Sequence, residues 1–427
     1  MHEKSPVPFS KRTLSLGSGD RQITFAVDDL CRHTIIFGSS GSGKTTRAFN
    51  PLLRDMLGKL GAGAFIVAAK PEAVLEAVEI ANRTGREYLV VQPGSPIGLD
   101  LLTGNPDVDA MYFRDTFGRV GDETKTWVDA AVARMKNSLR LLAAAGPQYY
   151  TFDALTSYVF DDEFSAHIRI FATERMRGWA KDSDETWTVH EAISYEEKRW
   201  LTYSPETRRA VQFAVGALLE PLRDIQIIKT FSRKQNLVSM DAVFEGKVII
   251  LHVPRTQFER AAQSIYTLAK RRFFTALEYR RSNPKLNQDR PVVFGIDEYQ
   301  LCISESDVQS LGIIRSAGCM VLGTTQGVSS LYSVLPQHVV DAALQNFTQK
   351  IFFKTDDHDT LAVLDCAVAK TTKDFDSTTL FKMKRDEGLC HVTAGDETID
   401  VVLPMLPLYV TPNYMSSAAP AAAGLRL

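Results

Sequence analysis

One glycine-rich stretch constrains the fold of this 427-residue chain more than any other part of its sequence. It matches the pattern G-x-x-x-x-G-K-[ST] and consists of Gly38, Ser39, Ser40, Gly41, Ser42, Gly43, Lys44 and Thr45. The apolar run Thr34–Phe37 leads directly into it. In loops of this kind, glycines let backbone N–H groups curl around a phosphate, and the following helix offers its positive N-terminal end. The stretch therefore predicts a strand–loop–helix unit that binds a nucleotide.

The last residues of this pattern carry the chemistry expected of a nucleotide site. Lys44 is expected to reach the β- and γ-phosphates, and the hydroxyl of Thr45 to bind Mg²⁺. The next residue, Thr46, is counted among the nucleotide-binding residues as well. A surface loop rich in serine and glycine is the alternative, but the apolar run that precedes the loop favours the nucleotide site. The expected ligands are ATP and Mg²⁺.

A second apolar run, Val292–Ile296, ends in two acidic residues. A phosphate loop needs an acidic residue on a neighbouring strand to hold Mg²⁺, and a group that polarises the attacking water. Asp297 is expected to be the metal residue, acting largely through water, and Glu298 the general base. A solvated acidic pair after an ordinary strand is the alternative, which the nearby phosphate loop disfavours. The adjacent glutamate also argues against a small-molecule kinase, which does not require one.

A third apolar run, Met320–Thr324, is followed by Thr325 and Gln326. The amide of Gln326 both donates and accepts hydrogen bonds, so it can sense a γ-phosphate or orient water. Taken alone, Gln326 is as easily an ordinary turn residue. Arg315, just upstream of the same run, is as easily a solvated side chain.

The whole chain alternates short β-branched runs with longer helical stretches, which is typical of a mostly parallel α/β core. The expected strands are 33–37, 64–68, 88–92, 247–253, 292–296, 320–324 and 350–354, followed by an antiparallel hairpin of 389–393 and 398–403. Between about 106 and 236 the strand signals nearly vanish, and 125–145 and 205–222 have apolar residues at helical spacing. The expected fold is an α/β core with an inserted all-α domain.

These patterns suggest a division of the chain. Residues 1–105 and 237–412 are expected to form the two parts of the nucleotide-binding domain, and 106–236 the all-α insertion. The distance of about 250 residues between Lys44 and Asp297 independently supports an insertion, since a minimal phosphate-loop core needs far fewer. The last segment, 413–427, is rich in alanine and too short to fold alone, so a disordered tail is expected.

Composition limits the class of protein and its compartment. The 49 Lys and Arg residues nearly balance 51 Asp and Glu, so any polyanion must be held by a local patch or channel. Five widely spaced cysteines without a C-x-x-C pair argue against disulfides and zinc, and for a reducing compartment. No signal peptide opens the chain, and no run approaches the roughly 18 apolar residues of a membrane span. A cytoplasmic chain without a transmembrane segment is expected.

Two regions depart from this even charge balance. Residues 255–290, interpreted as one long helix, contain nine Lys and Arg but three Asp and Glu. A DNA-facing or channel-lining role is one interpretation, but a solvated helix face is favoured. Residues 105–245 contain 18 basic and 22 acidic residues, a net charge of −4. The helical insertion is therefore a poor candidate for bulk DNA binding.

With these features the chain resembles the TraG/TraD-type coupling proteins of type IV secretion, a branch of the FtsK/HerA P-loop ATPases. The resemblance spans about 14–412 and rests on the Walker A stretch 38–45, the Walker B pair 297–298, and the segments 65–72, 92–102, 125–131, 311–326 and 346–355. Two features depart from the family. Ala69 replaces an acidic residue that is usual there. Most members also carry N-terminal membrane helices, whereas this chain reaches the ATPase core almost at once, as a soluble member or a shortened chain would.

The resemblance implies a RecA-like, Mg²⁺-dependent ATPase that forms a homo-hexameric ring. Hydrolysis at subunit interfaces would move DNA, or a DNA–protein conjugate, toward a secretion or conjugation channel. Gln326 would be a nucleotide sensor, and Arg315 an arginine finger acting on the neighbouring subunit's nucleotide. The implied partners are DNA, a relaxase or effector protein, and channel components at the inner membrane, where the chain would be peripheral.

Two other functions are left open. An FtsK/HerA-class DNA pump for packaging or defence would share the same core, although the helical insertion favours the coupling type. A nucleotide-dependent adaptor could instead recruit secreted proteins without hydrolysis. The intact set of Lys44, Thr45, Asp297 and Glu298 argues against this adaptor, because a retired ATPase usually loses one of them.

Overall fold

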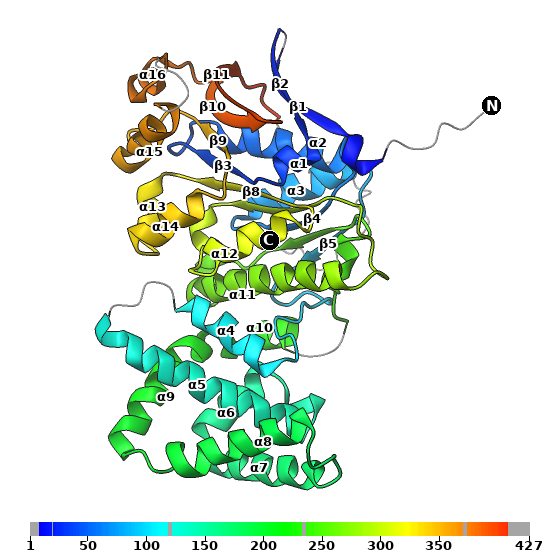
Figure 1. Cartoon of the computed structure of the whole chain (residues 1–427), viewed down its shortest axis with the longest axis vertical. Helices are drawn as coiled ribbons and strands as arrows, with labels where there is room; N and C mark the ends of the chain where they lie inside the picture. Colours follow the sequence, from blue (N-terminus) through cyan, green and yellow to red (C-terminus); the bar gives the residue numbers. More distant parts are fainter. Residues whose placement is uncertain (1–7, 19, 118–121, 233–235, 370–373, 409–427) are drawn as a thin grey trace, which may run out of the picture. The chain divides into compact units, whose positions relative to one another are not determined.

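The computed structural model describes residues 8–18, 20–117, 122–232, 236–369 and 374–408, and these residues form two compact units. The first unit includes the described parts of 1–92, 239–257 and 273–427, and the second includes those of 93–238 and 258–272. Figure 1 shows the two units as a sheet-containing part and an all-helical part. The expected tail, 413–427, lies outside the described residues.

The first unit is built on a nine-stranded sheet with the order β11-β10-β9-β3-β8-β7-β4-β6-β5. The strands of the unit are β1 (Thr13–Ser18), β2 (Arg21–Ala26), β3 (Thr34–Phe37), β4 (Gly63–Val67), β5 (Tyr88–Val91), β6 (Val248–Leu251), β7 (Val292–Asp297), β8 (Cys319–Thr325), β9 (Gln349–Phe352), β10 (Glu387–Ala394) and β11 (Glu397–Pro404). The seven strands from β9 to β5 run parallel, and β10 is antiparallel to both its neighbours. The mostly parallel α/β sheet expected from the sequence is confirmed.

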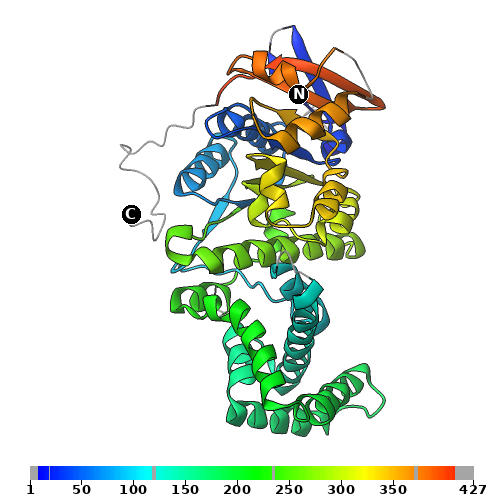
Figure 2. The same cartoon turned by 90° about the vertical axis from the view of Figure 1, so that its left-hand side faces the viewer.

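The central strands are apolar along their whole length because both faces of the sheet are covered. Every residue of β3, β7 and β8 is buried. The helices that lie wholly in this unit are α1 (Val27–Leu30), α2 (Asn50–Gly58), α3 (Pro71–Arg83), α12 (Asp307–Arg315), α13 (Val328–Tyr332), α14 (Gln337–Leu344), α15 (His358–Val368) and α16 (Ser377–Lys382). Figures 1 and 2 show helices of this unit on both sides of the sheet.

Neighbouring residues of one strand build the two halves of this core, since alternate side chains point to opposite faces. On β4, Ile66 belongs to the apolar cluster that includes Leu53 and Met56 of α2. The ring of Phe65, next to it, instead packs on Phe273 of helix α11 (Arg255–Ser282), with ring centroids 5.3 Å apart. The sheet is therefore packed on both sides, and only its edges and the loops at its ends remain for function.

The expected strands are confirmed with ends that differ by at most two residues, and the expected C-terminal hairpin is β10–β11. A second hairpin, β1–β2, was not expected. It pairs Thr13 with Ala26 and Ser18 with Arg21 as a separate two-stranded sheet. Its buried Leu14, Leu16 and Ile23 join the same apolar cluster as α2.

The long basic helix expected over 255–290 ends earlier, at Ser282, and its backbone is kinked at Phe258. The prediction that the basic side chains of this helix form a solvated face is also wrong for Arg280, whose side chain is 1% exposed. Its guanidinium donates to the carbonyls of Asn287 and Arg290, at 2.5 and 2.7 Å. This arginine therefore closes the loop after the helix and is not a surface charge.

The second unit is helical. Its helices are α4 (Pro106–Thr116), α5 (Asp122–Ala145), α6 (Phe152–Phe160), α7 (Asp162–Met176), α8 (Asp184–Tyr195), α9 (Pro205–Leu219) and α10 (Ile225–Phe231), with a π-helical turn, Glu196–Trp200, after α8. Helix α5 packs against α4, α6, α7, α8 and α9. Its Ala131, Met135, Leu139 and Leu142 are fully buried and recur at helical spacing on one face. This face is the centre of the unit's core.

Local sequence signals set the ends of these helices. Helix α5 stops at Ala145 because Gly146 adopts φ 143°, and Pro147 follows. N-cap side chains begin several others by accepting backbone N–H bonds: Thr151, Asp161, Ser183, Ser204 and Asp224. None of the helices in the described residues combines the length and apolar character required to cross a bilayer.

Candidate nucleotide-binding site

The glycine-rich stretch forms a tight loop between β3 and a π-helical turn, Lys44–Phe49. Gly41 and Gly43 adopt left-handed φ values of 74° and 101°, which other residues rarely adopt. A Cβ at Gly43 would also lie 2.8 Å from Cδ of Arg47, whose flexible side chain would have to shift. The two glycines are therefore required by the shape of the loop.

Lys44 lies at the start of this helical turn and is 7% exposed. Burial lowers the pKa of Lys44, while the charges of Glu298 and Asp297 act in the opposite direction. The negative charge of a bound phosphate would therefore stabilise the charged form of this buried ammonium group. Thr46, in the same turn, accepts a bond from Leu408 N–H at 2.8 Å through its carbonyl oxygen.

The side chains of Asp297, at the end of β7, and of Thr45, in the turn that follows β3, lie close together although β8 lies between these two strands. The hydroxyl of Thr45 lies 3.3 and 3.2 Å from the two carboxylate oxygens of Asp297. Thr324, at the end of β8, donates to the Asp297 carboxylate at 2.5 Å. Register explains the meeting, since Thr324 pairs with Asp297 on one side and Ile36 on the other.

These oxygens fit a magnesium ion. Mg²⁺ is usually held by one or two protein oxygens together with substrate phosphates and water. The Thr45 hydroxyl and the Asp297 carboxylate provide such a pair beside the phosphate loop. Among the described residues there is no cluster of three or more His, Cys, Asp or Glu that could hold a metal by protein groups alone.

Glu298 has a strained backbone and a fully engaged carboxylate. Its φ of 93° is left-handed, a conformation that costs a residue with a side chain about 1–2 kcal/mol. Its Oε2 accepts from Gln300 at 2.5 Å, and Lys70 Nζ lies 3.3 Å from Oε1. Burial alone would raise the pKa of Glu298, but the Gln300 bond and the charges of Lys70 and Lys44 outweigh burial, and the pKa is lowered. The carboxylate is therefore ionised near neutral pH.

Gln326 lies at the same edge as Glu298. Its Nε2 is 3.5 Å from Glu298 Oε1, and its side chain is exposed. The structure thus brings Lys44, Thr45, Asp297, Glu298 and Gln326 together, because β3, β7 and β8 are parallel and end at one edge of the sheet.

Arg315 does not join this group. It ends α12, before the start of β8 at Cys319, so it lies at the opposite edge of the sheet. A strand of seven residues spans roughly 20 Å, so Arg315 cannot reach the phosphate loop of its own chain. Its side chain is exposed and lines a cavity of about 390 Å³ together with Arg281 and Arg290.

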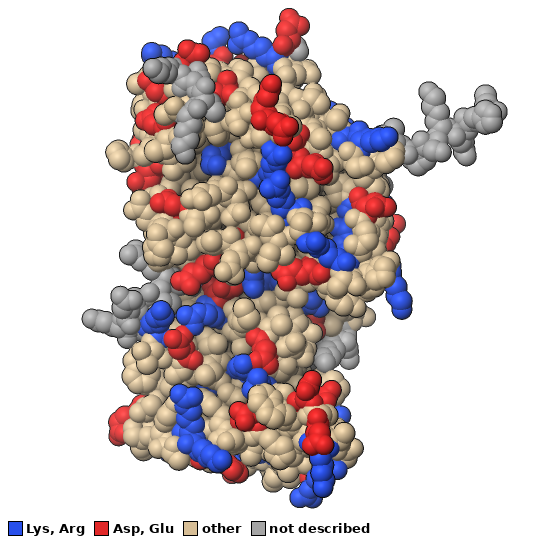
Figure 3. Space-filling view, in the orientation of Figure 1, with Lys and Arg blue, Asp and Glu red and all other residues tan. Residues whose placement is uncertain are grey.

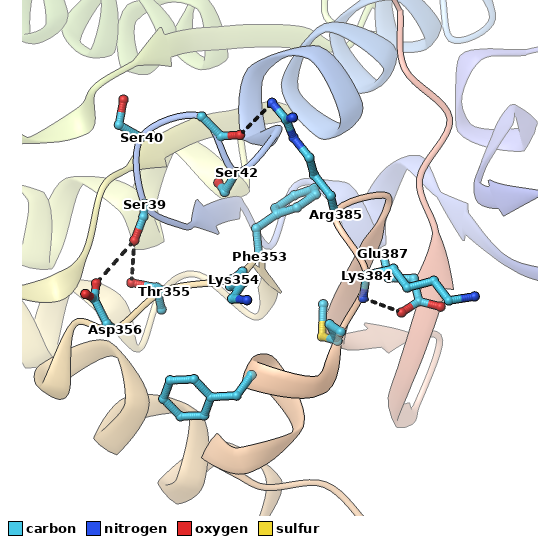
Figure 4. A pocket seen from close by; sticks show the side chains of 13 residues that line it. Ser39, Ser40, Ser42, Phe353, Lys354, Thr355, Asp356, Lys384, Arg385 and Glu387 are labelled. Atoms are coloured by element: carbon cyan, nitrogen blue, oxygen red, sulfur yellow. Dashed lines mark hydrogen bonds between the residues drawn. The ribbon is translucent and has the colours of Figure 1, made fainter.

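A second cavity, of about 480 Å³, adjoins the phosphate loop (Figure 4). Ser39 of the loop points toward Thr355 and Asp356, with its Oγ 3.4 and 3.5 Å from their oxygens. From the other side, Arg385 donates to the carbonyl oxygen of Gly41 at 3.3 Å. The exposed ring of Phe381 adds an apolar surface. The size and mixed lining of this cavity suit a nucleoside.

Sequence reasoning missed Thr324, Lys70 and Gln300. Thr324 lies near the end of the apolar strand β8, and Lys70 follows the apolar strand β4. The position at the end of a strand, which Glu298 and Gln326 share, was the one sequence signal that could have indicated a role for them. Nothing in the sequence pattern distinguishes them from ordinary residues at the end of a strand, because their partners come from other strands.

No protein-family model matches the sequence, and no curated protein sequence is significantly similar to it. Solved structures are similar in fold. The conjugative coupling protein TrwBdeltaN70 in its unbound form has a TM-score of 0.66 at 14% identity, covering 93% of this chain and 90% of its own. TrwB in complex with ADP and Mg²⁺ has a TM-score of 0.65 at 15% identity, covering 96% and 97%. VirB4 of Thermoanaerobacter pseudethanolicus has a TM-score of 0.55 at 16% identity, and the match covers 93% of this chain and 97% of VirB4.

The sheet, the glycine-rich loop and the carboxylate pair define a P-loop NTPase fold of the α/β class. More particularly, the fold is the one shared by the conjugative coupling protein TrwB and by VirB4, over nearly the whole chain.

Proposed function

We propose that this chain is a Mg²⁺-dependent ATPase that works as a ring motor and couples DNA, or a DNA–protein conjugate, to a type IV secretion or conjugation channel. One observation carries the proposal: the ionised carboxylate of Glu298 lies at the same sheet edge as the phosphate loop and the Thr45–Asp297 pair. The similarity in fold to a plasmid coupling protein solved with ADP and Mg²⁺ supports a nucleotide with Mg²⁺ at this site and a role in coupling.

In this mechanism each residue of the site has one task. The loop amides and Lys44 bind the β- and γ-phosphates of ATP. Thr45 and Asp297 would hold Mg²⁺, which would neutralise charge on the phosphates. Glu298 accepts the proton of the attacking water, and Gln326 orients that water. We infer that the cavity bounded by Ser39, Asp356 and Phe381 holds the nucleoside.

The mechanism also needs a ring. Arg315 lies at the sheet edge opposite its own phosphate loop, so it can serve hydrolysis only at a neighbouring subunit's site. We therefore propose a homo-hexamer in which Arg315 acts as an arginine finger in trans, stabilising charge that develops on the neighbour's γ-phosphate.

We further propose that the helical unit recognises protein partners, such as a relaxase or an effector, and leaves DNA to the sheet-containing unit. The two ranges that form this unit, 93–238 and 258–272, contain 22 Lys and Arg and 22 Asp and Glu, so the unit has no excess of positive charge to offer DNA. On the face seen in Figure 3, acidic and basic side chains are interspersed over the helical unit. Large apolar side chains of the helical unit are exposed, including Phe213 at 81% and Trp187 at 62%. Aromatic side chains are enriched at protein–protein interfaces, which supports a protein partner for this unit. Attachment at the inner membrane would then depend on channel components.

The experiment is to measure ATP turnover with and without single- or double-stranded DNA, together with particle mass. We expect Mg²⁺-dependent turnover that rises with DNA, and a six-subunit mass in the active fraction. ATP binding without turnover under all conditions would contradict the proposal and favour a nucleotide-dependent adaptor. A genomic neighbourhood that lacks channel and relaxase genes would favour an FtsK/HerA-class packaging or defence translocase.

A further inference from the structure

Both carboxylate oxygens of Glu298 are occupied by donors from this chain. Lys70 Nζ and Gln326 Nε2 lie 3.3 and 3.5 Å from Oε1, and Gln300 Nε2 donates to Oε2 at 2.5 Å. A general base must itself come within hydrogen-bond reach of the water that it deprotonates. A carboxylate offers about four lone-pair positions, so three donors leave little room for that water. The arrangement seen here is therefore a restrained form of the site.

The side chain of Lys70 is free to move away from Glu298 on steric grounds. Its side chain is 59% exposed, on the turn between β4 and α3, and its four-carbon stem is flexible. Helix α3 depends on the backbone of Lys70, whose carbonyl oxygen accepts from Ala73 N–H at 3.1 Å. The ammonium group can thus swing away from Glu298 without disturbing the helix or the sheet.

Lys70 also lines a cavity of about 360 Å³ that opens beside Glu298. Arg255 contributes a second cation to this cavity, and Thr256 and His252 contribute polar groups. Of the residues that line it, Glu298 is the sole acid, and all of them belong to the described part of the sheet-containing unit. When Lys70 swings toward Arg255, the two cations face the cavity together, and an anion there would hold Lys70 away from Glu298.

We propose that this cavity is an anion site, in which a backbone phosphate of the nucleic-acid cargo binds to Lys70 and Arg255, draws Lys70 away from Glu298, and so frees the carboxylate for the attacking water. The inference rests on the proposed function. A phosphodiester is favoured over a protein carboxylate because the proposed cargo is nucleic acid, and Lys and Arg contact its phosphates regardless of sequence. In this scheme Lys70 is a positioning residue that acts through Glu298.

The test compares ATP turnover of wild type, Lys70→Met and Lys59→Met, each alone, with a single-stranded oligonucleotide, and with polyglutamate. Lys59 is a matched control, since its side chain is 57% exposed and its Nζ pairs with Asp55 at 2.8 Å, away from the cavity. We expect Lys70→Met to raise turnover without cargo by roughly two- to five-fold, the size of effect that a partly exposed ion pair allows. The oligonucleotide should stimulate wild type and Lys59→Met but add little to Lys70→Met.

Three results would overturn the inference while leaving the proposed function intact. Turnover of Lys70→Met at or below that of wild type would mean that Lys70 does not restrain Glu298. Full oligonucleotide stimulation of Lys70→Met would place the anion site elsewhere. Stimulation by polyglutamate alone would identify a protein carboxylate as the ligand. A wild type without any turnover would instead contradict the proposed function, and this inference with it.

A second variant tests the other cation of the cavity. Arg255→Gln should raise the oligonucleotide concentration that gives half-maximal stimulation by several-fold, and this shift should shrink at high salt. Unchanged half-saturation in Arg255→Gln would remove Arg255 from the site and contradict the placement of the phosphate between the two cations.

Discussion

The hydroxyl of Thr324 donates to the carboxylate of Asp297 at 2.5 Å. These residues come from neighbouring strands, β8 and β7, which pair in parallel with Thr324 opposite Asp297. The same hydroxyl oxygen lies 3.3 Å from the backbone N of Glu298. A single buried threonine therefore holds both the proposed metal residue and the backbone of the proposed base.

Replacing this threonine should impair the metal site without affecting the core. Thr324→Val keeps the size and branching of the side chain but removes the donor to Asp297. We expect a loss of roughly 10- to 100-fold in turnover or in apparent Mg²⁺ affinity, as is typical for groups that orient a metal ligand. Mg²⁺ titration of turnover checks this. Thr324→Ser, which retains the hydroxyl, should stay near wild type. Equal losses in the two variants would point to packing as the cause.

The meeting of Lys44 and Asp297 at one edge of the sheet could be predicted from the sequence, because residues that follow parallel strands collect at one edge. The roles of Thr324 and Lys70 could not. Each acts through a residue more than 25 positions away, Asp297 or Glu298, and these contacts depend on strand order and register. Nothing in the sequence pattern indicated that β8 lies between β3 and β7.

Lys44 is the residue whose loss should be most severe. Lys44→Ala removes the charge expected on the β- and γ-phosphates, so we predict no measurable hydrolysis together with weaker nucleotide binding. Turnover and binding of a fluorescent ATP analogue check both parts. Wild-type turnover in Lys44→Ala would rule out the phosphate loop as the site of hydrolysis. Lys59→Met, in the same unit but away from the loop, is the control.

Arg315 tests the proposed ring. Arg315→Ala should bind ATP nearly normally yet lose activity on the order of 10³-fold, as is typical when an arginine finger is removed. Mixing Arg315→Ala with Lys44→Ala should restore part of the activity, because some interfaces then pair an intact loop with an intact finger. Arg281, which lines the same cavity and donates to Ser316, offers a nearby control, Arg281→Lys. Full activity of Arg315→Ala by itself would show that Arg315 is an ordinary surface residue.

His33 should make the stability of the first unit depend on pH. Burial lowers the pKa of His33 to about 4, despite its bond to the carbonyl of Leu311. In the unfolded chain the pKa is near 6.5, so the unfolded state binds more protons between pH 6.5 and 4, and stability falls as the pH falls through this window. Between pH 7 and 5 the cost is about 2 kcal/mol.

The check on this prediction is denaturant unfolding of wild type and His33→Asn at pH 7 and pH 5. Asn tolerates the left-handed φ of 63° at this position but cannot take up a proton. The loss of stability on acidification should be smaller in His33→Asn by about the same 2 kcal/mol. Equal losses in the two proteins would show that other groups cause the pH dependence.

Most of the sheet could be predicted because its strands are short, apolar and buried along their length. The β1–β2 hairpin was missed because its strands bury only alternate residues, with polar Ser15 and Thr24 between the buried ones, so neither strand shows the continuous apolar run of the central strands. Arg280 was misread for a related reason. Its burial depends on carbonyl acceptors in the following loop, and a count of charges along a helix cannot reveal them.

The central claim is that Glu298 is the base in ATP hydrolysis at this site, and Glu298→Gln tests it most directly. The amide keeps the shape of the side chain but cannot accept the proton of water. We predict that this variant binds ATP about as tightly as wild type, while its turnover falls by roughly 10² or more. Gln300→Ala, which removes a neighbouring donor, should have a much smaller effect. If Glu298→Gln hydrolysed ATP at the wild-type rate, the base would lie elsewhere and the account of this site would be wrong.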